Sequence, residues 1–543
     1  MTTRVPRAHL VIVGLAVLLQ FAGCSRRETF VEAGLRTQTL GTFIDREPGT
    51  LDPHLAGGDI TQLINALFEG LVSLANDGAT VLPGVAERWE ISDDGKVYVF
   101  HLRATARWSN GETVTAFDLR DSFLRFLDPQ LRSRFVNDLF MIAGAQEYAE
   151  GRNADATGVG LRAPDASTLV ITLSQRCPYF LVRLTEREVR PVHVASVDRW
   201  GGRHTRGGSW DRPEHLVSNG PFVLTEWQPN AVLILKKNPK YWDAARVRLN
   251  EIRFYPFDDS STAEHAYRAG QLHISNLPPA KRLTYRERQS PDLHLATSFS
   301  TRYLRFQTLK PPLTDARVRR ALSLAIDRPG LVTRVLNGFG APAHSLTAPG
   351  TGEYQPPALF SFEPREAQHL LANAGYAGGA GFPGVELLIP GKDSETVALA
   401  EALQQMWRHN LGIEVRIISN EGNVFLENLR SGNFQVSLNN WGYDINDPVE
   451  QFLLALSTYP SNQSGWKNSA YDLAFARSEV AASTTERRAA FDEMETLVAR
   501  DVPFTPLFHG SVALLVHPSV RGWRDNGFGT IDWREIWLAA PGH

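Results

Sequence analysis

Residues 83–118 read PGVAERWEISDDGKVYVFHLRATARWSNGETVTAFD, and this stretch says most about the fold. Apolar and polar residues alternate from Val97 to Leu102, which is typical of a half-buried β-strand. The Asn110-Gly111 pair that follows favours a tight turn, because both residue types accept positive φ. Thr115–Asp118 has the form of a helix capping box, so a helix is expected directly behind it. Strand, turn and helix in such close succession indicate a mixed α/β chain.

The rest of the chain continues in the same mixed style, without internal repeats or low-complexity tracts. Short apolar or alternating runs predict strands at residues 169–173, 232–235, 413–417 and 434–438. Apolar periodicity with capping residues predicts helices over residues 315–327, 364–375, 395–410 and 485–500. Stretches rich in Pro and Gly at 201–208, 341–357 and 377–391 are interpreted as surface loops.

Length and composition bound the class of protein. At about 100–200 residues per domain, 543 residues make two to four domains. Apolar residues make up 43% and charged residues 21%, which is ordinary for a globular protein and excludes a polytopic membrane protein. The net charge of −3 gives no basic field for nucleic acid. Only Cys24 and Cys177 are present, so a cysteine-rich metal cluster is excluded.

The N-terminus indicates secretion. Two arginines precede an apolar run from Leu10 to Leu19, which is too short for a mature membrane span but suits a secretory signal. Phe21-Ala22-Gly23-Cys24 resembles a bacterial lipobox, in which the cysteine becomes the lipidated first residue. We therefore expect a signal peptide at 1–23, a lipid on Cys24 and a polar tether at 24–38. The alternative is a plain secretory signal with a chance cysteine. With Cys24 lipidated, Cys177 is expected to be a buried structural thiol.

No motif for covalent chemistry is present. The sequence has no His-Glu-x-x-His, Gly-x-Ser-x-Gly or Gly-x-x-x-x-Gly-Lys pattern, and its 15 histidines are scattered. We therefore expect no enzyme activity, no metal site and no cofactor. A glycosidase is not excluded by this reasoning, because paired catalytic acids need not be close in sequence.

Several blocks together resemble the oligopeptide-binding proteins of ABC importers, solute-binding protein family 5. The block at residues 83–118 carries most of the resemblance. The others, in the same order along about 500 residues, are Leu51-Asp52-Pro53, Asn219–Phe222, Lys237–Trp242, Lys310–Leu313, Val318–Leu322 and Leu370–Tyr376. Any single block is weak evidence for the family. The occurrence of all of them in the same order, behind a lipoprotein signal, is specific evidence.

The resemblance implies a fold that periodicity alone does not give. It implies a bilobal periplasmic-binding-protein-like α/β body of type II, with three domains and two lobes that close over a solute. The implied division is a discontinuous lobe I (39–59, 192–280 and 512–543), an extra domain II (60–191) and a lobe III (281–511).

One segment carries the candidate site. An alternating stretch, Phe434 to Leu438, leads into Asn440-Trp441-Gly442-Tyr443-Asp444-Ile445-Asn446-Asp447-Pro448, whose Asn-Asp-Pro must turn. An acid at a strand end beside aromatic residues suits the capture of a cation. In the family, the first Asp of Trp-x-x-Asp-x-x-(Asp/Glu)-Pro pairs with the peptide α-ammonium, and the resemblance carries that role to Asp444. The alternative is a turn or N-cap aspartate, and Asp447 is expected to be structural.

The remaining site candidates also come from the resemblance. It implies that Trp441 helps to wall the pocket, although ordinary core packing is the alternative. The ligand backbone is expected to add as a strand, and the candidate main-chain partners and neighbours are Asn440, Gly442, Tyr443 and Glu47. Where some oligopeptide binders carry an arginine for the peptide C-terminus, this chain has Leu438. Lys310 is a candidate to meet the carboxylate instead. The alternatives are that the carboxylate stays solvated and that Lys310 has a structural role.

The sequence therefore predicts an extracytoplasmic, membrane-anchored and monomeric binding protein that delivers peptides to separate permease and ATPase subunits. A first rival keeps the fold and binds another solute, such as a nickel complex, haem, opine or oligosaccharide. A second is a secreted hydrolase, and a third is a chaperone or sensor role.

Overall fold

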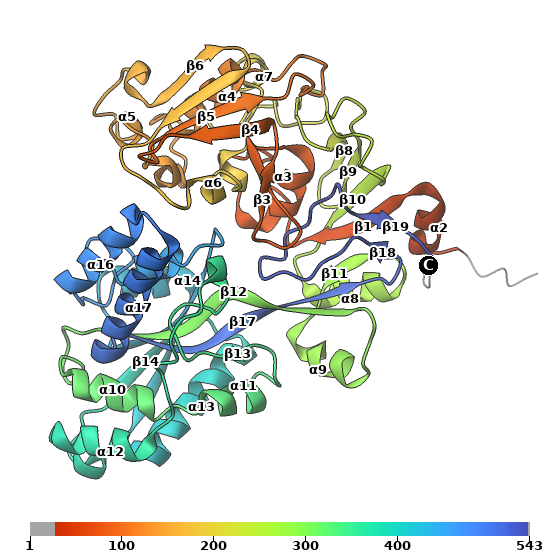
Figure 1. Cartoon of the computed structure of the whole chain (residues 1–543). Helices are drawn as coiled ribbons and strands as arrows, with labels where there is room; N and C mark the ends of the chain where they lie inside the picture. Colours follow the sequence, from red (N-terminus) through yellow and green to blue (C-terminus); the bar gives the residue numbers. More distant parts are fainter. Residues whose placement is uncertain (1–27, 541–543) are drawn as a thin grey trace, which may run out of the picture.

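The computed structural model describes residues 28–540, which form two lobes joined by two long strands. Strands β12 (Leu293–Phe306) and β17 (Phe504–Val516) pair antiparallel and run from one lobe into the other (Figure 1). Strand β17 also pairs with β11 (Ile274–Asn276) and β13 (Ala341–Pro342). These four strands belong to one seven-stranded sheet.

The first lobe contains a four-stranded sheet in the order β1-β10-β9-β8. Its strands are β1 (Thr39–Ile44), β10 (Glu251–Pro256), β9 (Val232–Lys237) and β8 (Phe222–Gln228). The helices around it are α2 (Phe30–Thr37), α3 (Thr61–Leu67), α7 (Val194–Trp200), α8 (Ser260–Arg268) and α9 (Pro279–Glu287). Segments far apart in sequence share its core: Leu40, Phe254 and Trp533 are all buried in one cluster. The C-terminal ribbon β18 (Val520–Arg521) and β19 (Trp537–Leu538) completes this lobe.

A second sheet, in the order β4-β5-β7-β6, stands beside the first with its own core. Its strands are β4 (Ala86–Ile91), β5 (Val97–Leu102), β7 (Thr168–Thr172) and β6 (Leu161–Asp165). The expected strand at 97–102 and the capping box at Thr115 are confirmed, with helix α4 (Ala116–Phe126) behind them. Smaller elements nearby are β2 (Val72–Leu74), β3 (Val81–Pro83), α5 (Ala145–Ala149) and α6 (Phe180–Arg183).

The other lobe adds β16 (Val436–Gly442), β14 (Val385–Pro390) and β15 (Val415–Asn420) to the shared strands. Its helices are α10 (Ala316–Leu324), α11 (Arg328–Arg334), α12 (Pro364–Asn373), α13 (Ser394–Leu411), α14 (Gly422–Arg430), α15 (Val449–Leu453), α16 (Ser469–Val480) and α17 (Thr484–Asp501). The expected helix at 395–410 is confirmed, and it stops at Gly412, whose φ of 68° a glycine adopts readily.

Three local predictions are wrong, each for a physical reason. The helix expected over 315–327 ends at Leu324, because Asp327 caps the next helix by accepting from the Gly330 N–H at 2.9 Å. Residues 385–390 are a central strand instead of a loop, since their apolar run lies between two parallel neighbours. In the stretch 341–357, residues 345–348 are buried rather than on the surface.

The expected tether at 24–38 is also wrong where it is described. Thr29 and Glu32 form a capping box that starts α2, and the Val31 N–H donates to the Gly270 carbonyl at 3.0 Å. Because Val31 and Gly34 are buried, this segment is part of the first lobe. The signal peptide and Cys24 lie outside the described residues. Among the described helices, none combines the length and apolar character needed to span a bilayer.

The residues in each hydrophobic core also indicate where domain II begins. Helix α3, which the implied division placed in domain II, packs with the first lobe through Leu63, Ile64 and Leu67. The core of the second sheet begins at Leu71 and ends at Val189. We therefore propose that domain II begins near residue 70. Cys177 lies in that core as a buried free thiol, and burial raises its pKa to about 12, as expected of a structural cysteine.

Candidate functional site

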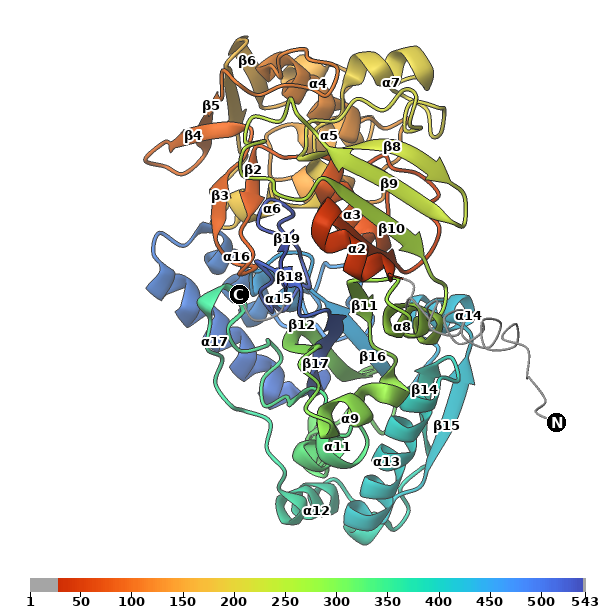
Figure 2. The same ribbon diagram turned by 90° about the vertical axis from the view of Figure 1, so that its right-hand side faces the viewer.

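A cavity of about 560 Å³ lies where the two lobes face each other. Its volume is within the range typical of small-molecule sites. It is lined mainly by residues within 42–45, 58–75, 182–190, 443–446 and 512–534. These stretches come from both lobes and from the second sheet's domain, so a ligand held here would touch all three. In Figure 2, α6 lies in the upper part of the molecule and α15 in the lower part. The cavity stretch 182–190 begins within α6, and the stretch 443–446 lies just before α15.

Tyr443 fixes the end of β16 at the cavity. Its N–H donates to the Phe299 carbonyl at 3.0 Å, and its ring stacks on Phe299. Its hydroxyl accepts from the Ala348 N–H at 3.0 Å. Both Tyr443 and Asp444, which directly follow the end of this strand, line the cavity.

Asp444 presents a carboxylate that makes no hydrogen bond or ion pair with any described residue. Its side chain is exposed to the cavity and otherwise surrounded by protein. Burial raises its pKa above the usual range. The negative charge of Glu188 raises it further, and Arg183 and Arg187 oppose the rise. An unpaired carboxylate of this kind is costly without a cation, and a ligand cation would remove that cost.

The carboxylate of Asp447, by contrast, has hydrogen-bond partners within the fold. It accepts two hydrogen bonds from Arg487, at 2.6 and 2.8 Å, and one from the Val449 N–H at 2.9 Å. These contacts hold the turn at Pro448 and the start of α15. Asp447 therefore has the structural role that the Asn-Asp-Pro turn predicts.

The other predicted site residues do not line the cavity. Trp441 donates from Nε1 to the Glu450 carbonyl at 3.0 Å and packs edge-on against Tyr459. Asn440 and Gly442 are exposed on β16. Lys310 lies in the loop after β12, and its N–H donates to the Gln307 carbonyl.

Glu47 lines a different, smaller pocket of about 340 Å³. Its carboxylate accepts from Trp227 Nε1 at 2.7 Å and from the Asn230 N–H at 2.9 Å. The structure therefore brings Asp444 and Tyr443 to the cavity and leaves the other five outside it.

Comparison with known proteins now places the chain. The model of the "Bacterial extracellular solute-binding proteins, family 5 Middle" matches residues 80–463. The chain belongs to this family. The periplasmic oligopeptide-binding protein OppA of Escherichia coli is 32% identical over 535 residues, 96% of either chain. The probable deoxycholate-binding periplasmic protein YgiS of E. coli is 35% identical over 492 residues, 88% of this chain and 89% of YgiS.

A solved relative of this family-5 protein shows the same architecture. The unliganded open form of the periplasmic murein tripeptide-binding protein MppA is 30% identical. It superimposes with a TM-score of 0.80 over 92% of this chain and 97% of its own. The fold is thus the bilobal type II binding-protein arrangement that the resemblance implied.

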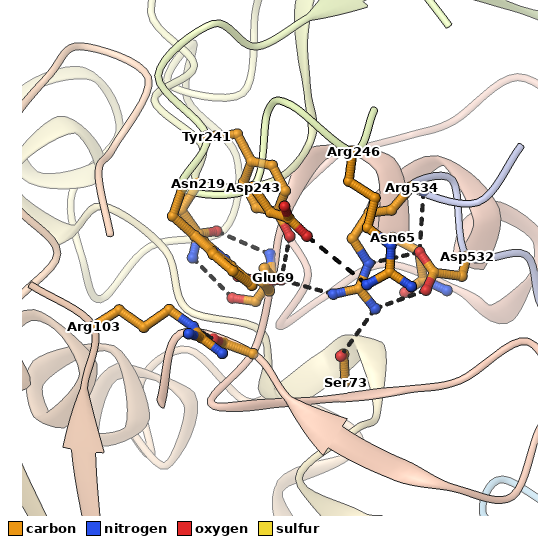
Figure 3. Close-up of polar contacts among 12 residues, drawn as sticks. Asn65, Glu69, Ser73, Arg103, Asn219, Tyr241, Asp243, Arg246, Asp532 and Arg534 are labelled. Atoms are coloured by element: carbon orange, nitrogen blue, oxygen red, sulfur yellow. Dashed lines mark hydrogen bonds and ion pairs between the residues drawn. The ribbon is translucent and has the colours of Figure 1, made fainter. Parts of the chain in front are cut away.

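The family-5 chain also has a buried cluster of charges beside the cavity that sequence reasoning missed. Glu69 accepts from Trp242 Nε1 at 2.6 Å and from the Tyr241 hydroxyl. Arg534 bonds Asp532 at 2.7 Å and Glu69 at 3.3 Å (Figure 3). Each of these charged groups has partners within the protein, so the cluster ties distant segments of the first lobe together. Its members are up to 465 positions apart in the sequence, so no local sequence pattern predicts the cluster.

The two lobes also touch beside the cavity. Arg183 at the end of α6 donates to the Glu450 carboxylate of α15 at 2.5 Å, and both side chains are buried. The Tyr179 hydroxyl donates to Glu479 of α16 at 2.7 Å. Burial raises the pKa of Glu479 to about 7. These contacts join the two lobes at one edge of the cleft.

Proposed function

We propose that this chain captures peptides in the cavity between its lobes and delivers them to the permease of an ABC importer. The observation that carries the proposal is the unpaired Asp444 carboxylate facing the cavity. A peptide α-ammonium placed there would gain a desolvated, charge-assisted hydrogen bond. The relatives named for oligopeptides and murein tripeptide support this ligand class.

The mechanism needs no covalent step. The ligand bridges residues of both lobes and so stabilises the closed arrangement over the open one. Strands β12 and β17 are the connection about which the lobes would rotate. Peptide main-chain groups would pair with backbone at the cavity wall, and side chains would lie in solvated space, which tolerates different sequences.

The surrounding assembly completes the proposal. We infer that the chain is a non-catalytic, monomeric subunit held on the outer side of the membrane by a lipid on Cys24. The relatives named as periplasmic support the location. The permease and its ATPases would be separate chains.

A steroid is the second ligand class to weigh, because YgiS is named as probably deoxycholate-binding. The cavity has an apolar side suited to such a ligand, with Phe43, Leu514, Trp523 and Phe528. Deoxycholate carries a carboxylate, however, and the free carboxylate of Asp444 would repel it. The electrostatics of the site thus favour an amine-bearing ligand.

Native mass spectrometry of the soluble chain lacking residues 1–24 tests the ligand class directly. Purified from cells, the protein is expected to carry a heterogeneous mixture of peptides. A single bile acid, sugar or metal complex in place of that mixture would overturn the proposal.

The role of Asp444 is tested by calorimetry with one peptide in free and N-acetylated form. Asp444→Asn should weaken binding of the free peptide by about 2–5 kcal/mol, whereas the exposed Asp93→Asn should leave it unchanged. The acetylated peptide should bind poorly to the parent protein. Equal affinity for both peptides would refute the ammonium assignment.

A further inference from the structure

Glu186 offers the cavity a second carboxylate without a partner in the described part of the chain. It follows α6 and lines the same cavity as Asp444, and its carboxylate makes no hydrogen bond or ion pair with any described residue. Burial raises its pKa well above the usual range, and the charges of Glu188 and Asp444 add to the rise. The two carboxylates therefore lie within electrostatic range of each other, on opposite sides of the cleft.

The neighbouring charges do not neutralise this pair. Five carboxyl groups interact here: Asp138, Glu186, Glu188, Asp444 and Glu450. Three guanidinium groups interact with them, and each is shared with another acid: Arg183 also lies 3.6 Å from Asp138, and Arg190 also interacts with Glu69. Arg183 bonds Glu450 at 2.5 Å, and Arg187 is 3.6 Å from Glu188.

One of the surplus acids is held in its neutral form. Burial raises the pKa of Asp138 to about 8, and its hydrogen bond with Glu188 contributes. Of the five acids, Glu186 and Asp444 are the two that line the cavity.

We propose that Glu186 binds a second cation of the ligand, so that the site selects peptides whose first residue has a basic side chain. This inference rests on the proposed function, in which the α-ammonium meets Asp444. A lysine or arginine side chain keeps its cation close to its own α-amino group, so both can be reached in one cavity. Glu186 then acts from the opposite wall and draws the lobes together around the ligand.

The test compares two tripeptides that differ only in the first residue, lysine or its uncharged isostere norleucine. We expect the parent protein to bind the lysine peptide at least about 30-fold more tightly. Glu186→Gln should abolish that preference and leave the norleucine affinity within about threefold. The norleucine peptide thus reports whether the variant is folded. Glu147→Gln, an exposed carboxylate in the same domain, is the matched control and should keep the preference.

The outcomes separate the two proposals. If neither tripeptide binds the parent protein, the proposed peptide function fails. If both bind equally, or if Glu186→Gln retains the lysine preference, peptide binding stands and the role of Glu186 is refuted. Loss of both affinities in the variant would assign Glu186 to the shape of the site and overturn its role in selecting a cation.

Discussion

Glu495 allows the sharpest test of how this structure positions its site. Its buried carboxylate accepts the N–H groups of Leu346 and Thr347 at 2.9 and 2.8 Å. That loop continues to Ala348, which donates to the hydroxyl of Tyr443 beside Asp444. Burial raises the pKa of Glu495 to about 7 from 4.5. Glu495 is thus a positioning residue whose protonation is coupled to stability.

The sign of the pH effect follows from that shift. Between pH 4.5 and about 7, the folded state holds a proton on Glu495 that the unfolded state has released. Stability is therefore highest at the acid end of this window and falls as the pH rises. At 1.36 kcal/mol per pKa unit, Glu495 accounts for a loss of about 3 kcal/mol across the window.

Glu495→Gln replaces the titrating group and turns its amide N–H₂ toward one of the two backbone donors. The cost of one unpaired donor is about 1–3 kcal/mol. We expect the variant to be less stable than the parent by that amount near about pH 5 and equally or more stable near about pH 8. Glu479 and Asp138 titrate in both proteins, so their contributions cancel in the difference.

Urea unfolding of the chain lacking residues 1–24, followed by tryptophan fluorescence, measures this difference. Glu493→Gln on the same helix is the control, because its side chain is exposed and pairs only with the exposed Arg477. It should change stability by less than about 1 kcal/mol at either pH. A Glu495→Gln difference that is the same at both pH values would refute the reasoning, because it would show that Glu495 does not titrate in this window.

Two further predictions follow from buried groups. Arg183→Met leaves Glu450 buried without its partner and should lower the free energy of unfolding by about 3–5 kcal/mol. The double variant that also carries Glu450→Met should recover most of the loss, and urea unfolding would contradict this if the single variant cost below about 1 kcal/mol. The thiol of Cys177, buried and with its pKa raised to about 12, should resist alkylation in the folded protein and react in urea. Mass spectrometry would count against this if labelling were as fast in the folded as in the unfolded chain.

The parts of the fold that sequence predicts well are those with local causes. The strand at 97–102, the capping box at Thr115 and the stop at Gly412 each depend on neighbours a few residues away. Errors arise where tertiary packing overrides local composition. Strand β14 lies between Gly and Pro residues that read as a loop, and only the parallel partners on both sides make it a central strand.

The residues of the candidate site show the same difference between local and tertiary causes. Asp444 could be predicted, because a strand, two aromatic residues and a turn place it within nine residues of sequence. Glu186 could not, since its importance comes from the absence of a partner, which only the assembled fold reveals. The nearest local signal is the alternation of acids and arginines at 186–190, which by itself predicts a self-neutralised surface.

The charged groups that stabilise this fold have partners within the protein, whereas the carboxylates proposed to select the ligand have none in the described part of the chain. Glu69, Arg534 and Asp447 have charged or hydrogen-bonding partners within the fold, so their charges are already compensated without a ligand. The carboxylates of Asp444 and Glu186 have no partner among the described residues, and burial raises their pKa values and so disfavours their charged forms. A cationic ligand restores those charged forms, and the free energy recovered adds to binding. A neutral or anionic solute recovers none of it, so the same two carboxylates provide both affinity and discrimination.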